Sequence, residues 1–250
     1  MSPIKGADLV PIFVGAKGKD VPEGFVRDDV GDNISDRNGD FCELTAHYYM
    51  WKNVEADAYG LFQYRRVMVD KRTRRPYVLV FRRKKAERLI AKTDFEGLLK
   101  TSPMILPRLE DMKISVREHF GNTHNIEDLR EIEGIIKEHF PEYSVAVDTY
   151  LNGTMCLFGN MFVMTKERFL DYSKWLFCIL GYQNSPTTPR RAGYLAEPLQ
   201  GIYATYHNDA LFLPKAEIAE YFPHPVKKYL LYFLLPPGTK RRARAKKLFA

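Results

Sequence analysis

Short apolar runs alternate with amphipathic stretches along the first half of the chain. Four runs, each ending at glycine, proline or a polar residue, predict strands: residues 10–14, 58–62, 77–81 and 104–106. Helical periodicity lies between them at residues 42–52, 85–91 and 95–99. Strands that alternate with helices indicate an α/β fold in layers, with a mostly parallel central sheet.

The second half of the chain is more helical. Asn125 is expected to cap a helix that ends near Phe140, and Thr165 is expected to cap a second, longer helix. The polar, proline-containing segment 183–191 predicts a loop or lid. Two extended pieces are expected on either side of a glycine–asparagine pair: residues 155–158 and 161–164.

Length and composition favour one domain with a short appendage. The 250 residues are 45% hydrophobic, enough for one sizeable core. We expect a domain over residues 1–225 and a basic amphipathic tail over residues 226–250. The three cysteines are far apart and form no CxxC motif, which argues against disulfides and zinc. No signal-peptide pattern and no apolar run of roughly 18 residues is present, so a cytoplasmic location is expected.

The formal net charge of +7 is concentrated in a few basic runs. Residues 82–88 are interpreted as a solvated basic face. Residues 240–247 follow the apolar run 229–235, and together they predict peripheral attachment to an anionic membrane surface. The alternative is that the apolar run packs on the domain. No DNA- or RNA-binding motif accompanies the charge, so we expect no nucleic-acid partner.

Residues 33–53 consist of a polar loop followed by a well-marked helix. Asp40 stands three residues before Glu43, the spacing of a capping box in which each side chain satisfies a backbone amide. Asp32 and Asn33 precede this helix start, where a sugar, a ribose or a phosphate can be held. The residues alone do not distinguish among these ligands.

Several blocks of the sequence are similar to one known family. They are PIFVGA (11–16), DNIS with FCELTA and WKN (32–53), GNMFVMTKERFLDYSKWLF (159–177) and GYLAE (193–197). A strand end at Tyr64, Arg65 and Arg66 completes the pattern. The chain resembles bacterial glycosyltransferases of capsular and exopolysaccharide gene clusters that carry the domain of unknown function 4422. The resemblance implies a GT-A-like, Rossmann-type layered fold.

The same resemblance implies an activity and its substrates. The expected reaction transfers a hexose, galactose in furanose or pyranose form, from a UDP-linked nucleotide sugar to a lipid-linked oligosaccharide. A non-catalytic carbohydrate- or nucleotide-binding module is the alternative. The chain departs from the family in three places. The family usually has a strand before PIFVGA, histidine in place of Gln63 and arginine in place of Pro198.

Donor binding is expected at a strand end that lacks a metal motif. The chain contains no Asp-x-Asp, so we expect no cofactor and a metal dependence that is absent or weak. Tyr64, Arg65 and Arg66 stand in the corresponding place, and guanidinium groups can neutralise a diphosphate. Alternation puts the two arginines on opposite faces, so one is expected to face the cleft. A solvent-exposed edge is the alternative.

Glu197 is the expected catalytic base. Pro198 is expected to keep Glu197 out of a helix and to begin a helix itself. Glu197 would then project from a loop, as the base of an inverting GT-A enzyme does. The alternative is a carboxylate that only caps the helix.

Three residue pairs complete the predicted site. They are Asp32 and Asn33 for donor hydroxyls, Gly15 and Ala16 for close approach of the base or ribose, and Gly159 and Asn160 on the acceptor side. An Asx turn that only shapes the loop is the alternative for the first pair. The six histidines show no metal-binding spacing. We expect surface or core positions for His119 and His124, with the cleft as the alternative.

Overall fold

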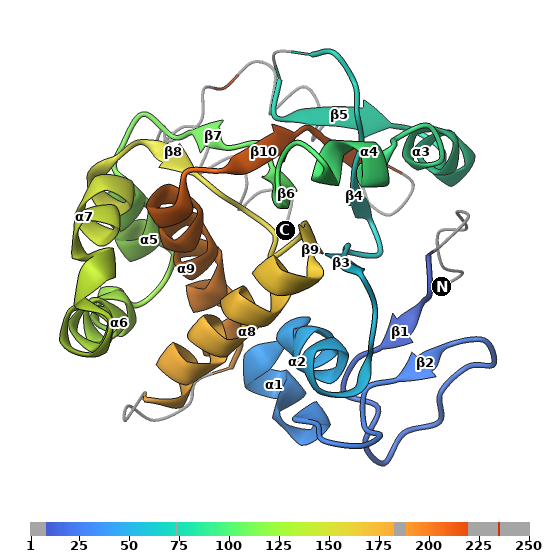
Figure 1. Ribbon diagram of the computed structural model, residues 1–250, viewed down its shortest axis with the longest axis horizontal. Coiled ribbons are helices and arrows are strands. Elements are labelled where there is room, and N and C mark those ends of the chain that lie inside the picture. The colour runs from blue at the N-terminus through green and yellow to red at the C-terminus, as the bar shows by residue number, and fades with distance from the viewer. Residues whose placement is uncertain (1–8, 74, 183–188, 220–234, 236–250) are drawn as a thin grey trace.

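A four-stranded mixed sheet lies at the centre of the fold (Figure 1). The computed structural model describes residues 9–73, 75–182, 189–219 and 235. The strands are β3 (Ala58–Leu61), β6 (Met104–Pro107), β9 (Phe162–Thr165) and β10 (Ala210–Leu213), in the order β10-β6-β9-β3. β10 is parallel to β6, whereas β9 is antiparallel to both of its neighbours. The α/β class is confirmed. The mostly parallel sheet is wrong, because an apolar run looks the same in either chain direction.

A second sheet of three strands follows from the first through Pro214. Its strands are β4 (Arg66–Met68), β5 (Tyr77–Val80) and β11 (Lys215–Ile218), in the order β4-β11-β5. β11 is antiparallel to β4 and parallel to β5. Two helices cover this region, α3 (Arg83–Ile90) against the small sheet and α4 (Phe95–Leu99) against β6 and β9. The predicted strand at 77–81 and both predicted helices are confirmed.

Two short strand pairs lie outside these sheets. β1 (Ile12–Phe13) pairs in parallel with β2 (Val26–Arg27), and β7 (Glu110–Asp111) is antiparallel to β8 (Met155–Cys156). The strand predicted at 10–14 is therefore shorter than expected and peripheral. After β2 the chain forms η1 (Ser35–Arg37), α1 (Asn38–Phe41) and α2 (Leu44–Asn53). The helix predicted over 42–52 corresponds to α2.

Helices dominate the second half, as the sequence predicts. They are α5 (Val116–Thr123), α6 (Ile126–His139), η2 (Pro141–Tyr143), α7 (Ser144–Asn152), α8 (Lys166–Gly181) and α9 (Arg191–His207). The Asn125 side chain caps α6 by accepting a hydrogen bond from the Glu127 N–H at 3.2 Å. Thr165 Oγ1 caps α8 by accepting from the Arg168 N–H at 3.4 Å. Both predicted caps are confirmed.

Helix α9 continues through Pro198, so the helix start predicted there is wrong. Proline lacks the N–H that would bond the Tyr194 carbonyl, and its ring crowds that carbonyl, at a cost of about 3 kcal/mol in a helix interior. Leu195 and Leu199 on the same helix are fully buried, and each such side chain stabilises the fold by about 1.5–3 kcal/mol. Tertiary packing outweighs the local preference, so Glu197 lies inside a helix and not on a loop.

Asp40 and Glu43 do not form the predicted capping box. Asp40 Oδ1 accepts a hydrogen bond at 2.8 Å from the backbone N–H of Ala192, in the first turn of α9. Glu43 Oε1 accepts hydrogen bonds from the side-chain amides of Gln63 and Asn160. Partners far away in the sequence satisfy both carboxylates, and local spacing cannot reveal such partners.

Two predicted segments fall mainly outside the described residues. They are 183–188 of the expected loop or lid, and the expected tail 226–250 apart from residue 235. Among the residues that the structure describes, no helix combines the length and the apolar character needed to cross a bilayer.

His47 makes the stability of the fold depend on pH. Burial lowers the pKa of its imidazole from 6.5 to about 3. The folded chain keeps the ring neutral, whereas the unfolded chain takes up a proton below about pH 6.5. The stabilisation is therefore present above pH 6.5 and is lost as the pH falls toward 3. Between pH 7 and pH 5 the loss amounts to about 2 kcal/mol.

The variant His47→Phe tests this dependence. The imidazole Nε2 lies 2.8 Å from Ser173 Oγ, which also donates to the Phe169 carbonyl at 2.6 Å and keeps that bond in the variant. Urea unfolding at both pH values should show a pH-dependent loss that is about 2 kcal/mol smaller in the variant than in the wild type. Equal losses in the two proteins would contradict a buried neutral His47.

Candidate active site

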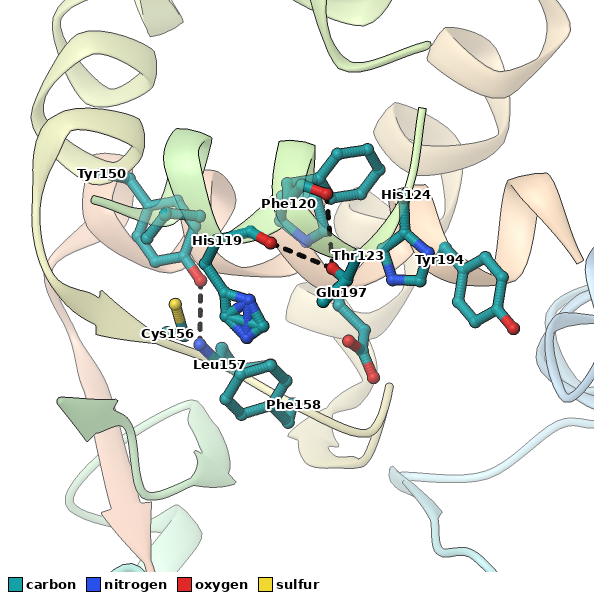
Figure 2. A pocket seen from close by; sticks show the side chains of 12 residues that line it. His119, Phe120, Thr123, His124, Tyr150, Cys156, Leu157, Phe158, Tyr194 and Glu197 are labelled. Atoms are coloured by element: carbon teal, nitrogen blue, oxygen red, sulfur yellow. Dashed lines mark hydrogen bonds between the residues drawn. The ribbon is translucent and has the colours of Figure 1, made fainter. Parts of the chain in front are cut away.

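Glu197 projects from α9 into a cleft (Figure 2). Its Oε1 accepts a hydrogen bond from the Gly159 N–H at 2.7 Å. Burial raises the pKa of Glu197 to about 7, and the negative charge of Glu43 raises it as well, whereas the Gly159 amide, Lys215 and Arg66 lower it. A carboxyl group with a pKa near 7 can exchange a proton at neutral pH, which is what a general base requires.

The turn that carries Gly159 and Asn160 is held by three hydrogen bonds, two of them to α9. Both residues have positive φ angles, +107° and +43°, which glycine and asparagine tolerate better than other residues. The Asn160 amide donates to the Gly193 carbonyl of α9 at 2.8 Å and to Glu43 Oε1 at 3.2 Å. The backbone N–H of Gly159 is thereby aimed at Glu197, so the predicted acceptor pair and the predicted base lie together.

A chain of polar side chains leads from Glu43 to the small sheet. The Gln63 amide donates to Glu43 at 3.2 Å and accepts from Arg66 at 3.2 Å. Arg66 also donates to Glu217 Oε1 of β11 at 2.9 Å. Gln63 thus donates through its amide nitrogen and accepts through its amide oxygen. Together, Gln63 and Arg66 connect the carboxylates of Glu43 and Glu217. Sequence reasoning treated Glu43 only as a helix cap and did not single out Glu217.

Half of the residues that line the cleft beside Glu197 are aromatic, and the cleft volume is about 40 Å³. The His124 ring stacks on Tyr194 with ring centroids 4.0 Å apart, and His119 lies 5.4 Å from the ring of Phe158 (Figure 2). Burial lowers the pKa of His124, and Arg190 lowers it further, so the ring is neutral at pH 7. Both histidines therefore line the cleft, the alternative that the sequence left open.

Tyr64 and Arg65 form the tip of a tight turn. Gln63 and Arg66 pair through two backbone hydrogen bonds of 3.1 Å, so the chain reverses here and does not end as an extended strand. Tyr64 is 57% exposed, and the Arg65 guanidinium lies 5.5 Å from its ring centroid. The charge of the neighbouring Arg66 lowers the pKa of Glu197.

Gly15 and Ala16 donate their backbone N–H groups within the protein. Both bond the buried Asp28 carboxylate, at 2.7 and 2.9 Å, and Ser35 Oγ donates to the same group at 2.6 Å. Gly15 has φ +65°, and a Cβ there would lie 2.7 Å from atoms of the Asn38 side chain. The glycine is therefore required by internal packing. Sequence reasoning did not single out Asp28.

Asp32 and Asn33 lie in the loop between β2 and η1. Asn33 Oδ1 accepts from the Ser35 N–H at 3.2 Å, which is an Asx turn. Asp32 is exposed, and its carboxylate accepts from the Tyr48 hydroxyl at 3.2 Å. Within the described part of the chain, the hydrogen bonds of both residues thus stay within this loop or reach Tyr48 and Asn53 of α2.

The sequence matches a family model described as a domain of unknown function, DUF4422, over residues 3–209. The chain belongs to the DUF4422 family. This confirms the resemblance on which the site prediction depends. No curated protein matches the chain.

A solved structure is similar to this DUF4422 chain over most of its length. It is the apo structure of the WbbM bifunctional glycosyltransferase, with a TM-score of 0.76 and 28% sequence identity. The similar region covers 86% of this chain and 43% of that chain. The DUF4422 chain therefore spans less than half of the WbbM chain that it matches. The similarity confirms the GT-A-like layered fold.

No metal cluster is present in the described part of the DUF4422 chain. Residues 9–73, 75–182 and 189–219 contain no group of three or more His, Cys, Asp or Glu side chains placed to hold an ion. Burial raises the pKa of the Cys156 thiol, which lines the cleft, to about 12.

Proposed function

We propose that this DUF4422 protein is a glycosyltransferase. The observation that carries the proposal is Glu197, whose pKa near 7 and hydrogen bond from Gly159 prepare it to accept a proton inside a cleft. The similarity to the WbbM bifunctional glycosyltransferase supports the same reaction class. We propose a hexose as the transferred group, galactose in furanose or pyranose form, from a UDP-linked donor.

In the proposed reaction Glu197 removes the proton of an acceptor hydroxyl as that oxygen attacks the anomeric carbon and the nucleoside diphosphate leaves. A general base that activates the acceptor hydroxyl is the group that an inverting transfer requires. Gly159 and Asn160 shape the acceptor side, and the Gly159 N–H orients the carboxylate. Donor contacts are proposed for Arg66, whose guanidinium suits a phosphate, and for the other predicted residues Gly15, Ala16, Asp32, Asn33, Tyr64 and Arg65.

The proposed acceptor is a lipid-linked oligosaccharide of capsule or exopolysaccharide synthesis at the cytoplasmic face of the membrane. Attachment through the basic tail 226–250 stays a prediction, because that segment lies almost wholly outside the described residues. We propose no nucleic-acid partner.

A non-catalytic nucleotide- or carbohydrate-binding module is the second candidate. Two departures from the family pattern favour it. Gln63 cannot titrate where the family usually has histidine, and Pro198 replaces the usual arginine beside Glu197. Such a module would bind a sugar nucleotide and leave it unchanged.

The two candidates are separated by measuring binding and turnover on the same sample. A panel of UDP-sugars is screened for thermal stabilisation, because a ligand that binds only the folded state raises the melting temperature. Release of UDP is then measured with the stabilising donor and a membrane extract as the source of acceptor. Stabilisation with UDP release supports the transferase. Stabilisation without release supports the module, and no stabilisation by any donor would contradict both.

Turnover is expected to survive removal of divalent metal. The chain has no Asp-x-Asp, and arginine can replace a metal at a diphosphate because its charge is permanent. Dialysis against EDTA, followed by assay with and without added Mn²⁺, should change UDP release less than threefold. Loss of turnover that Mn²⁺ restores would contradict this expectation.

A further inference from the structure

The outer side of α3 carries a dense group of cations, called here the α3 basic face. It consists of Arg82, Lys84, Lys85, Arg88 and Lys92, all of them exposed. The opposite side of the helix carries Ala86 and Ile90, which are buried against the small sheet. The helix is therefore held by the fold, and its charged side faces solvent.

The α3 basic face has no compensating acid in the described part of the chain. Glu87, the single acidic residue in segment 81–92, pairs with Arg83 at 3.3 Å. Within residues 9–73, 75–182 and 189–219, no carboxylate forms an ion pair with any of the five cations. Like charges on one helical face repel one another, and an external anionic partner would relieve this repulsion.

An exposed aromatic residue directly precedes the cations in the chain. Phe81 stands directly before α3 and is 58% exposed. The cations and the half-buried Leu89 also line a hollow on the same side of the helix. Cations beside an exposed phenyl ring are the combination that binds a bilayer, since the ring enters the interface while the charges meet lipid phosphates.

We propose that the α3 basic face and Phe81 dock the protein on an anionic bilayer surface. This surface is separate from the predicted C-terminal tail, and it does not depend on the sugar-transfer proposal. A nucleic-acid duplex would also meet these charges through its phosphates, but it would leave the exposed Phe81 ring without an apolar contact. α3 packs on β4 and β11, which carry Arg66 and Glu217, so docking would hold the candidate site near lipid-linked molecules.

The test uses the full chain and vesicles of phosphatidylcholine with one third phosphatidylglycerol. Lys84→Gln, Lys85→Gln and Arg88→Gln are combined in one variant, called the α3 variant. Each basic residue near such a surface contributes about a fivefold gain in partitioning, so the variant should bind about a hundredfold more weakly. A matched variant neutralises three other exposed lysines, Lys19, Lys52 and Lys174. It has the same net charge and should stay within about threefold of the wild type.

Two further measurements complete the experiment. Phe81→Ser should weaken vesicle binding without changing its salt dependence, because the ring contributes apolar contact and no charge. Raising the salt to about 1 M, where the Debye length is ~3 Å, should release the wild type. Melting temperatures should show that every variant is folded, and the α3 variant should melt at or slightly above the wild-type temperature because it removes like-charge repulsion.

Three outcomes would overturn the proposal. The first is equal vesicle binding by the wild type and the α3 variant. This result would show that the α3 basic face does not contribute to vesicle binding. The second is that the matched variant loses as much vesicle affinity as the α3 variant. This result would show that the loss depends on net charge and not on the position of the cations. The third is that a duplex oligonucleotide binds the wild type, and loses affinity in the α3 variant, under conditions in which the vesicles do not bind.

Discussion

The Glu197→Gln variant is expected to lose sugar transfer by roughly a hundred- to ten-thousandfold, the range that a positioned general base contributes. A glutamine oxygen still accepts the hydrogen bond from the Gly159 N–H, so the cleft keeps its shape. The amide cannot take a proton from the acceptor. Thermal stabilisation by the donor should therefore persist while UDP release falls. Unchanged turnover would reduce Glu197 to a structural residue.

The pH dependence of the wild-type rate tests the same role. Only the ionised form of Glu197 takes up a proton, and its pKa is about 7. kcat/KM should therefore rise as the pH passes through 7 and level off above it. Glu43→Gln removes a charge that raises the pKa of Glu197, while a glutamine oxygen can still accept from Gln63 and Asn160. The rise should then move to lower pH, and an unmoved midpoint would contradict the assignment.

Replacing Arg191 with methionine is expected to destabilise the fold by about 3–5 kcal/mol, the cost of breaking a buried ion pair by removing one partner. Only 1% of the Arg191 side chain is exposed, and its Nε lies 2.9 Å from Asp128 Oδ1. The same guanidinium bonds Glu131. Both carboxylates lie on α6, so this arginine fastens the start of α9 to that helix, and the variant leaves two carboxylates without their cation.

A matched variant on α6 separates this effect from loss of charge. Arg130 pairs with Glu127 three residues away, and both side chains are more than half exposed. Arg130→Met should therefore cost less than about 1 kcal/mol. Urea unfolding of the two variants beside the wild type measures the difference. Equal destabilisation by the two changes would show that the burial of Arg191 has no energetic consequence.

The elements that sequence predicted well are those whose signals are local. A cap depends on one side chain and the first free amides of its own helix, so Asn125 and Thr165 were identified correctly. The same kind of reasoning failed at Asp40 and Pro198. The first caps another helix, and the second is carried inside α9 by the packing of its neighbours. In both places a tertiary partner competes with the local preference and wins.

By itself the sequence determined the α/β class, the helical second half, the helix caps and the family, because these depend on residues that are close together in the chain. Only the tertiary structure decided what surrounds Glu197. Gly159 lies 38 residues from Glu197, and Asn160 lies 117 residues from Glu43. No periodicity or spacing rule spans such separations. The burial that raises the pKa of Glu197 therefore exists only once these segments have packed together.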